Sequence, residues 1–282
     1  MKVLVTGVGG QLGYDVVKVL KARNIDYIGA DLKEFDITDY NAAHGFIADY
    51  GPDAVIHCSA FTAVDRAEDE SELCRRVNVL GTENIAKICQ EIDAKMIYIS
   101  TDYVFPGTGE EFYEVDSPTE PQNVYGQTKR EGELAVKNIL MKYFIVRISW
   151  VFGINGNNFI KTMLKLGKER SELNIVADQI GSPTYTADLA PLLCDMVLTD
   201  KYGTYHATNE GICSWADFAE EIFKQAGLNC KVNHIKAEEY PTKAARPKNS
   251  RMSKKSLNEV GFNSLPVWQD SVARYLKEMG IN

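Results

Sequence analysis

A glycine-rich turn near the start of the chain constrains its fold more than any other sequence feature. An apolar, β-branched run, Lys2–Thr6, leads into the turn, and a helical pattern follows it. Gly7, Gly10 and Gly13 are regularly spaced along this turn. The spacing lets the backbone turn sharply, approach a pyrophosphate closely and begin a helix whose amides point at the phosphates. Glycines can also form a plain turn, but their place between a strand and a helix indicates a dinucleotide site.

An acidic residue after the second predicted strand bears on the choice of cofactor. The strand Ile25–Ala30 ends in Asp31, about 20 residues beyond the glycines. A carboxylate there can accept hydrogen bonds from the adenosine ribose hydroxyls and repels a 2′-phosphate. Asp31 therefore favours NADH, with NADPH as the alternative because Lys33 is close by. Capping a helix is the other ordinary role of an acid at the end of a strand.

Strands and helices alternate through the first half of the chain, which is typical of a parallel sheet covered on both faces. The later expected strands are a short one ending at Asp36–Asp39, then Pro52–Ser59, Lys95–Ser100 and Leu140–Val151. Beyond Gly153 the order is less regular, which suggests a smaller lobe interleaved with returns to the sheet. We predict an α/β fold with a doubly wound, Rossmann-type parallel sheet. Residues 1–150 are expected to bind the cofactor, with returns near 174–200, and residues 151–282 to form mainly a substrate-binding lobe.

Small and polar residues follow several of these strands, at the edge where doubly wound sheets bind ligands. Asp36 and Ile37 are expected to flank the adenine, while Thr38 or Asp39 caps the next helix. The cofactor-binding candidates up to this point are Gly7, Gly10, Gln11, Leu12, Gly13, Asp31, Asp36 and Ile37.

Two later strand ends bring the expected cofactor and substrate together. Ser59 and Ala60 are small enough for a cofactor to lie across the end of their strand. Thr62 and Val64 would then reach the substrate side. Thr101 ends the following strand, and its hydroxyl can grip a substrate carbonyl.

The stretch VYGQTKR from Val124 to Arg130 holds a tyrosine and a lysine four residues apart. On a helix, Tyr125 and Lys129 would share one face. A free Tyr titrates near pKa ~10, so proton exchange at neutral pH needs a depression of roughly three units, or about 4 kcal/mol. A buried cation can supply much of that. Alone, the pair also fits a solvated helix face.

Two polar residues in apolar surroundings are better explained by structure than by chemistry. Asn78 lies within the helix predicted from Glu68 to Glu91, where its amide is expected to tie neighbouring backbone together. Arg147 lies inside an apolar strand and must be paired if it is buried, so an ion pair competes with substrate contact as its role. The acidic stretch Glu110–Pro121 is expected to be a loop that covers the site.

Composition excludes several classes of function. The net charge of −8 is spread along the chain, without a basic block interleaved with aromatic residues, which argues against a nucleic-acid partner. Apolar runs are far shorter than the ~20 residues of a membrane span. The start of the chain lacks a secretion signal, so a cytoplasmic location is expected. The six cysteines form no C-x-x-C pair and the four histidines show no ligand spacing, so we expect reduced thiols and no metal.

These residues resemble those of the extended short-chain dehydrogenase/reductase family, and within it the dTDP-4-dehydrorhamnose reductases. The T-G-x-x-G-x-x-G turn at Thr6–Gly13 and the Y-x-x-x-K pattern at Tyr125–Lys129 are similar to the superfamily's motifs. The more specific blocks are AFTAVDRAE from Ala60, VN from Val77, STDYVF from Ser100, RISWVFG from Arg147, NF at Asn158, DQIGSPTY from Asp178, YHATN from Tyr205 and ARPKNS from Ala245. They run in order over nearly the whole chain.

The resemblance implies reduction of the C4 ketone of a dTDP-4-keto-6-deoxy-L-hexose to dTDP-L-rhamnose. Tyr125 would deliver a proton to the developing alkoxide, and Thr101 would donate a hydrogen bond to the carbonyl. Lys129 would lower the pKa of Tyr125 and bind the nicotinamide ribose. The implied substrate contacts are Thr62, Val64, Thr101, Asp102, Tyr103, Trp150 and Arg246.

These residues also allow other interpretations. Arg246 would contact the diphosphate, since guanidinium suits phosphate geometry, or is a loop charge. A sugar-nucleotide epimerase or 4,6-dehydratase would use the same fold and Tyr–Lys pair. A non-catalytic regulatory subunit related to this family is the third reading, although Thr101, Tyr125 and Lys129 are retained. Some relatives form dimers around magnesium, but the sequence shows no such carboxylate cluster, so we expect a monomer or homodimer without metal.

Overall fold

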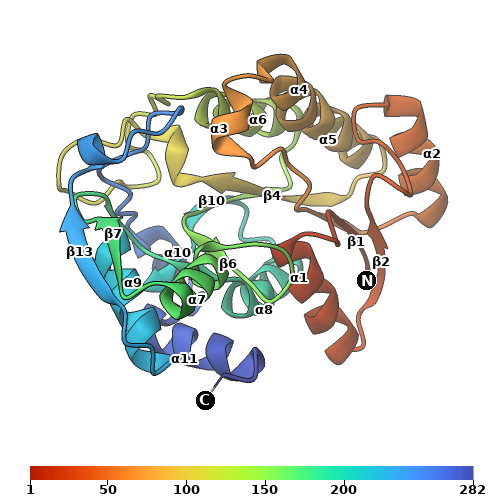
Figure 1. The fold of residues 1–282 in the computed structure, drawn as a ribbon. Helices are drawn as coiled ribbons and strands as arrows, with labels where there is room; N and C mark the ends of the chain where they lie inside the picture. Colours follow the sequence, from red (N-terminus) through yellow and green to blue (C-terminus); the bar gives the residue numbers. More distant parts are fainter. Residues whose placement is uncertain (282) are drawn as a thin grey trace.

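A six-stranded parallel sheet forms the centre of the molecule (Figure 1), in a computed structural model that describes residues 1–281. The strand order is β10-β5-β4-β3-β1-β2. The strands are β1 (Lys2–Thr6), β2 (Asp26–Ala30), β3 (Ala54–His57), β4 (Lys95–Thr101), β5 (Tyr143–Ile148) and β10 (Gly203–His206). Because the order reverses between β1 and β3, a crevice opens at the carboxyl ends of these strands. The predicted doubly wound α/β fold is confirmed.

Helices cover both faces of this sheet. One face packs against α1 (Gln11–Ala22) and α8 (Thr186–Val197), which also contact each other. The other carries α2 (Tyr40–Tyr50), α5 (Thr82–Glu91) and α6 (Val124–Ile139). Successive strand residues enter opposite cores, since Val3 and Val5 face α1 while Leu4 faces the second set. Coverage on both sides explains the continuous apolar runs of the strands.

The predicted third strand at Asp36–Asp39 is wrong. This segment forms turns, because the Asp36 carboxylate accepts the Thr38 N–H at 2.8 Å and so competes with strand pairing. Asp39 does cap α2 as expected, accepting the Ala42 N–H at 3.1 Å. β2 is therefore the edge of the sheet.

The single helix predicted over Glu68–Glu91 is also partly wrong. The short helix α3 (Val64–Ala67) ends before this segment, which instead contains α4 (Ser71–Arg75) and a π-helical turn η1 (Arg76–Gly81) that continues into α5. Asn78 lies in that turn, where its amide accepts the Phe61 N–H at 2.8 Å and donates to the Phe61 carbonyl at 3.1 Å. The predicted structural brace is confirmed, and it holds the loop after β3.

The later part of the chain builds a second core beside the sheet. The elements beyond β5, apart from α8 and β10, are β6 (Val151–Phe152), α7 (Phe159–Glu169), β7 (Glu172–Val176), β8 (Ile180–Gly181), β9 (Thr184–Tyr185), β11 (Asn209–Glu210), β12 (Cys213–Ser214), α9 (Trp215–Gln225), β13 (Lys231–Ile235), α10 (Lys255–Glu259), β14 (Leu265–Val267) and α11 (Trp268–Glu278). Of these, α10 and β14 place Leu257 and Leu265 in the core of the large sheet instead. Two short 3-10 turns are η2 (Asp102–Val104), which follows β4, and η3 (Ala237–Glu239). β7 pairs with β13 outside the large sheet, whereas α8 and β10 return to it. The division at residue 150 stays a prediction.

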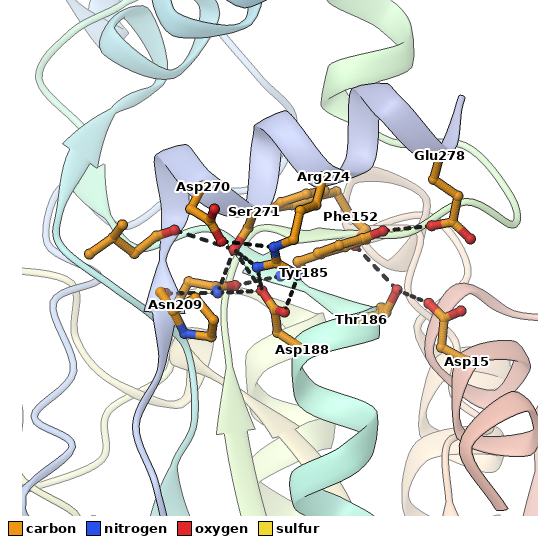
Figure 2. A network of polar contacts seen from close by, with 12 residues as sticks. Asp15, Phe152, Tyr185, Thr186, Asp188, Asn209, Asp270, Ser271, Arg274 and Glu278 are labelled. Atoms are coloured by element: carbon orange, nitrogen blue, oxygen red, sulfur yellow. Dashed lines mark hydrogen bonds and ion pairs between the residues drawn. The ribbon is translucent and has the colours of Figure 1, made fainter. Parts of the chain in front are cut away.

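A partly buried polar network ties the last helix to the rest of the molecule (Figure 2). The Arg274 guanidinium donates to both oxygens of Asp188 at 2.6 and 2.8 Å. Ser271 and Asn209 donate to the same carboxylate. The network fixes α11 against α8 and so joins the second core to the sheet. Within residues 1–281, no helix is long and apolar enough to cross a membrane.

Candidate active site

A cleft of about 620 Å³ opens at the carboxyl ends of the central strands. It brings together nearly every residue that the sequence predicts for the site. Those that line it are Gly7, Gly10, Gln11, Leu12, Gly13, Asp31, Asp36, Ile37, Ser59, Ala60, Thr62, Val64, Thr101, Asp102, Tyr103, Tyr125, Lys129 and Trp150. Arg246 lies in an adjoining hollow. The roles of these residues stay predictions.

The glycine turn fits a pyrophosphate. A Cβ on Gly13 would lie 2.2 Å from the Gly7 carbonyl oxygen, so no side chain is tolerated there. Gly7 itself has a positive φ of 71°. Gly10 caps α1 without a side-chain hydrogen bond among the described residues, which leaves the first amides of the helix open to an anion. The cradle therefore suits the phosphates of a dinucleotide.

Asp31 stands beside this turn, at the end of β2. Its Oδ2 accepts the Gly9 N–H at 2.6 Å, and its own N–H donates to the Glu34 carboxylate at 2.9 Å. These bonds hold the Asp31 carboxylate against the turn and in the wall of the cleft. Its contact with a ribose hydroxyl stays a prediction.

Tyr125 lies in the first turn of α6, opposite the glycine turn. Asn123 caps this helix by accepting the Gly126 N–H at 2.7 Å. The Tyr103 ring meets the Tyr125 ring edge-on, with centroids 5.7 Å apart. Burial, reinforced by the nearby Asp102 carboxylate, raises the pKa of Tyr125, and a hydrogen bond with Thr101 only partly offsets this. The expected lowering of this pKa by Lys129 is therefore wrong, because desolvation of the phenol dominates and Lys129 is not among the groups that shift it.

Lys129 lies one turn further along α6 and is 3% exposed. Its ammonium lies over the Tyr98 ring, 4.1 Å from the ring centroid. Burial lowers the pKa of Lys129 to about 7, against the raising effect of Glu133. A buried amine of this kind can hold or release a proton near neutral pH.

Thr101 belongs to a chain of hydrogen bonds that the sequence did not reveal. Its hydroxyl donates to Asp102 Oδ1 at 2.9 Å, and Ser250 donates to Asp102 Oδ2 at 2.6 Å. Burial raises the pKa of Asp102 to about 6, although both hydroxyls oppose the rise. Ser250 comes from a distant segment, and only its place in the ARPKNS block signalled it. In this structure the Thr101 proton is directed at Asp102 rather than into the cleft.

Arg147 makes a buried ion pair with Glu133, which is one of the two roles predicted for it. It therefore stabilises the fold. Its Nε and Nη2 each donate to Glu133 at 2.8 Å. The Ser100 hydroxyl also donates to Glu133, at 2.7 Å. Burial by itself would raise the pKa of Glu133, and it is the largest single influence. The hydrogen bonds and the charge of Arg147, together with the Ser100 hydroxyl, outweigh it and lower this pKa. The pair is fully satisfied and lies behind the cleft.

Arg246 lines a second hollow of about 630 Å³ that shares Tyr103 with the main cleft. Its guanidinium pairs with Asp65 at 2.7 Å and donates to the Tyr103 hydroxyl at 3.3 Å. Lys248 and Arg251 line the same hollow. Sequence reasoning missed Asp65, Lys248 and Arg251, because their meeting depends on long-range packing of the 245–251 segment.

Trp150 closes the cleft on the side of the second core. It follows β5 in a left-handed backbone conformation, with φ 49°. For a residue other than glycine this geometry costs roughly 1–2 kcal/mol, and such strain concentrates at functional sites. The expected strand Leu140–Val151 is accordingly broken here into β5 and β6.

Comparison with known proteins agrees with this geometry. The family model described as "RmlD substrate binding domain" matches residues 1–281. A dTDP-4-dehydrorhamnose reductase of Aggregatibacter actinomycetemcomitans is 40% identical, over 95% of this chain and 96% of its own length. A crystal structure of a dTDP-4-dehydrorhamnose reductase from Clostridium acetobutylicum superposes with a TM-score of 0.97 at 41% identity, covering 99% of this chain and 100% of that one.

A second solved structure was determined with a cofactor. The dTDP-4-dehydrorhamnose reductase from Bacillus anthracis, in complex with NADP, has a TM-score of 0.96 and 43% identity, covering 98% of this chain and 99% of that one. The resemblance inferred from the sequence is confirmed, and the chain belongs to the RmlD substrate binding domain family.

Proposed function

We propose that this protein reduces the C4 ketone of dTDP-4-dehydro-L-rhamnose to dTDP-L-rhamnose with a nicotinamide cofactor. The observation that carries the proposal is that the glycine turn, Thr101, Tyr125 and Lys129 line a single cleft. Relatives of matching length that are named as this reductase support the choice of substrate.

Tyr125 is the proton donor of the proposed reaction. Its raised pKa keeps the phenol protonated at neutral pH, which is the form that a reduction consumes. The cofactor, when bound, supplies the hydride that forms the new C4–H bond. The O–H bond of Tyr125 breaks as the ketone oxygen becomes a hydroxyl, and the phenolate then takes a proton from water. Lys129 lines the same cleft, and with a pKa of about 7 its amine can take up or release a proton there and bind the nicotinamide ribose hydroxyls.

The remaining residues hold the substrate and the cofactor. The glycine turn and the open start of α1 would bind the pyrophosphate, and Asp31 the adenosine ribose. Arg246 faces the hollow beside Tyr103, where a diphosphate would meet a guanidinium held in place by Asp65. Asp31 favours NADH, whereas a solved relative contains NADP, so we propose that both are accepted.

A direct assay separates this function from the alternatives. Purified protein is mixed with dTDP-4-keto-L-rhamnose and NADH or NADPH, and cofactor oxidation is followed by absorbance. The reductase consumes one cofactor for each sugar. An epimerase or dehydratase would turn over without net oxidation, and a non-catalytic subunit would not turn over at all. A cytoplasmic location and a monomeric or homodimeric state stay predictions.

A further inference from the structure

Two stacked indoles lie where the second core meets the cleft. The rings of Trp150 and Trp215 have centroids 3.8 Å apart, and their planes differ by 15°. Trp150 is half-buried and lines the cleft that holds Tyr125. Trp215 begins α9. The stack therefore connects one wall of the cleft to the first turn of a helix outside the sheet.

The backbone that carries Trp150 is held by three hydrogen bonds to the segment 182–184. Its carbonyl accepts the Thr184 N–H at 3.2 Å, and the preceding Ser149 carbonyl accepts the Thr184 hydroxyl at 2.6 Å. The Ser149 hydroxyl donates to the Ser182 carbonyl at 2.7 Å. These bonds maintain the left-handed conformation of Trp150, which would otherwise relax to an ordinary one. The left-handed backbone conformation therefore sets the direction in which the Trp150 side chain leaves the main chain.

The position of the ring itself depends on the small sheet formed by β8 and β12. Their pairing places Cys213 opposite Gly181. A Cβ on Gly181 would lie 2.9 Å from the Trp150 ring, so the indole edge rests directly on this backbone. A capping box at Ser214 then starts α9 and presents Trp215 to the Trp150 face.

Other aromatic residues hold Trp215 from behind. The Phe159 ring lies 4.7 Å from the Trp215 ring, centroid to centroid, and Phe218 lies 6.2 Å away. Both indoles are half-buried and pack against the second core, but only Trp150 lines the cleft. Stacked aromatic rings have preferred geometries, so a fixed Trp215 restricts the rotation of its partner.

We propose that Trp215 is a positioning residue, which holds the Trp150 indole in place so that the sugar ring of the substrate can pack against it. The proposal rests on the proposed function, since it requires a sugar in the cleft. An indole offers a flat apolar surface to the C–H face of a sugar, which must lie still for its ketone to meet Tyr125. Without Trp215 the Trp150 side chain gains rotational freedom, and binding of the sugar is weakened while binding of the nucleotide is retained.

The test compares Trp215→Leu with Trp215→Phe, and uses Trp268→Phe as the control. Trp268 is buried in the same core and meets Phe218 edge-on, with centroids 5.6 Å apart. Far-ultraviolet circular dichroism reports the stack through its exciton couplet, which Trp215→Leu is expected to abolish. Titration calorimetry then gives affinities for dTDP-L-rhamnose and for dTDP.

We expect Trp215→Leu to weaken dTDP-L-rhamnose binding by about tenfold while dTDP binding changes by less than about twofold. Trp215→Phe keeps a ring face and should recover most of the affinity, and the control should match the wild type. Loss of the couplet with an unchanged ratio of the two affinities would overturn the proposal, as would equal weakening of both ligands. A wild-type protein that binds dTDP-L-rhamnose no better than dTDP would also overturn it.

The binding measurement does not depend on turnover. A wild-type protein that prefers dTDP-L-rhamnose to dTDP but reduces no keto-sugar would contradict the proposed reductase activity alone. The effect of Trp215→Leu on the affinity ratio would still decide the role of Trp215.

Discussion

Helix α6 carries two buried charged sites one turn apart, and they are built in opposite ways. At Glu133 the carboxylate meets Arg147 through two hydrogen bonds of 2.8 Å and receives a third from Ser100. At Lys129 the ammonium faces an aromatic ring, and burial lowers its pKa to about 7. Buried charges that are fully paired maintain a fold, whereas a buried charge held by weaker contacts is available to a ligand or a reaction.

The largest expected effect falls on Tyr125, which lies one turn before Lys129 on the same helix. Tyr125→Phe removes the only atom of this side chain that can donate a proton, so kcat should fall by about 10²–10⁴-fold. Cofactor oxidation with the keto-sugar measures the loss, with Tyr205→Phe as a control remote from the cleft. An unchanged rate would remove Tyr125 from the mechanism.

The paired site should respond in stability instead. Glu133→Gln leaves the Arg147 guanidinium buried without a counter-charge, which is expected to lower the free energy of unfolding by about 3–5 kcal/mol. Urea denaturation measures this loss, and Glu131→Gln on the same helix serves as the control, because it breaks the partly exposed ion pair with Arg75 and should cost about 1 kcal/mol or less. If Glu133→Gln unfolds like the wild type, the division between the two sites fails.

Lys129→Met should show the reverse pattern, with activity lost and stability gained. Removing a buried amine is expected to raise the free energy of unfolding at pH 7 by about 1–2 kcal/mol. The folded-state pKa of Lys129, about 7, lies below its ordinary value of 10.5. Between pH 7 and pH 10.5, Lys129 therefore carries a proton in the unfolded chain but has lost it in the folded protein. The free energy of unfolding of the wild type rises with pH through this window.

Urea denaturation across that pH range measures the difference in free energy of unfolding between Lys129→Met and the wild type. This difference should shrink as the pH rises. An advantage that grows with pH, or a variant less stable than the wild type at pH 7, would contradict the account of Lys129 as a destabilising buried amine.

The smallest expected effect concerns the cofactor. Asp31→Ala removes the carboxylate that would repel a 2′-phosphate. The ratio of kcat/KM for NADPH to kcat/KM for NADH should therefore rise several-fold, which corresponds to about 1 kcal/mol or less in activation free energy. Asp26→Ala, at the start of the same strand, is the control. An unaltered preference would show that Asp31 does not select the cofactor.

Local patterns allowed much of this structure to be predicted. The glycine turn, the alternating strands and the Tyr125–Lys129 pair are set by neighbours in sequence, and the structure brings all three to one cleft. The turn at Asp36 was missed because a side-chain hydrogen bond overrides the apparent strand.

Features that depend on distant segments could not be read in the same way. Ser250 reaches Asp102 across 148 residues of chain, and Trp215 reaches Trp150 only through the pairing of β8 with β12. The pKa of Tyr125 was predicted in the wrong direction, because the sequence showed the nearby lysine but not the depth of burial. Burial and long-range pairing arise from tertiary packing.

The central claim is that this cleft transfers a hydride to a sugar ketone while Tyr125 supplies the proton. The direct measurement uses a reduced nicotinamide cofactor with deuterium at both C4 positions and dTDP-4-keto-L-rhamnose, followed by NMR of the sugar product. We expect one cofactor oxidised for each sugar and deuterium at C4 of the product. Turnover without net cofactor oxidation, or a product without deuterium at C4, would contradict the account.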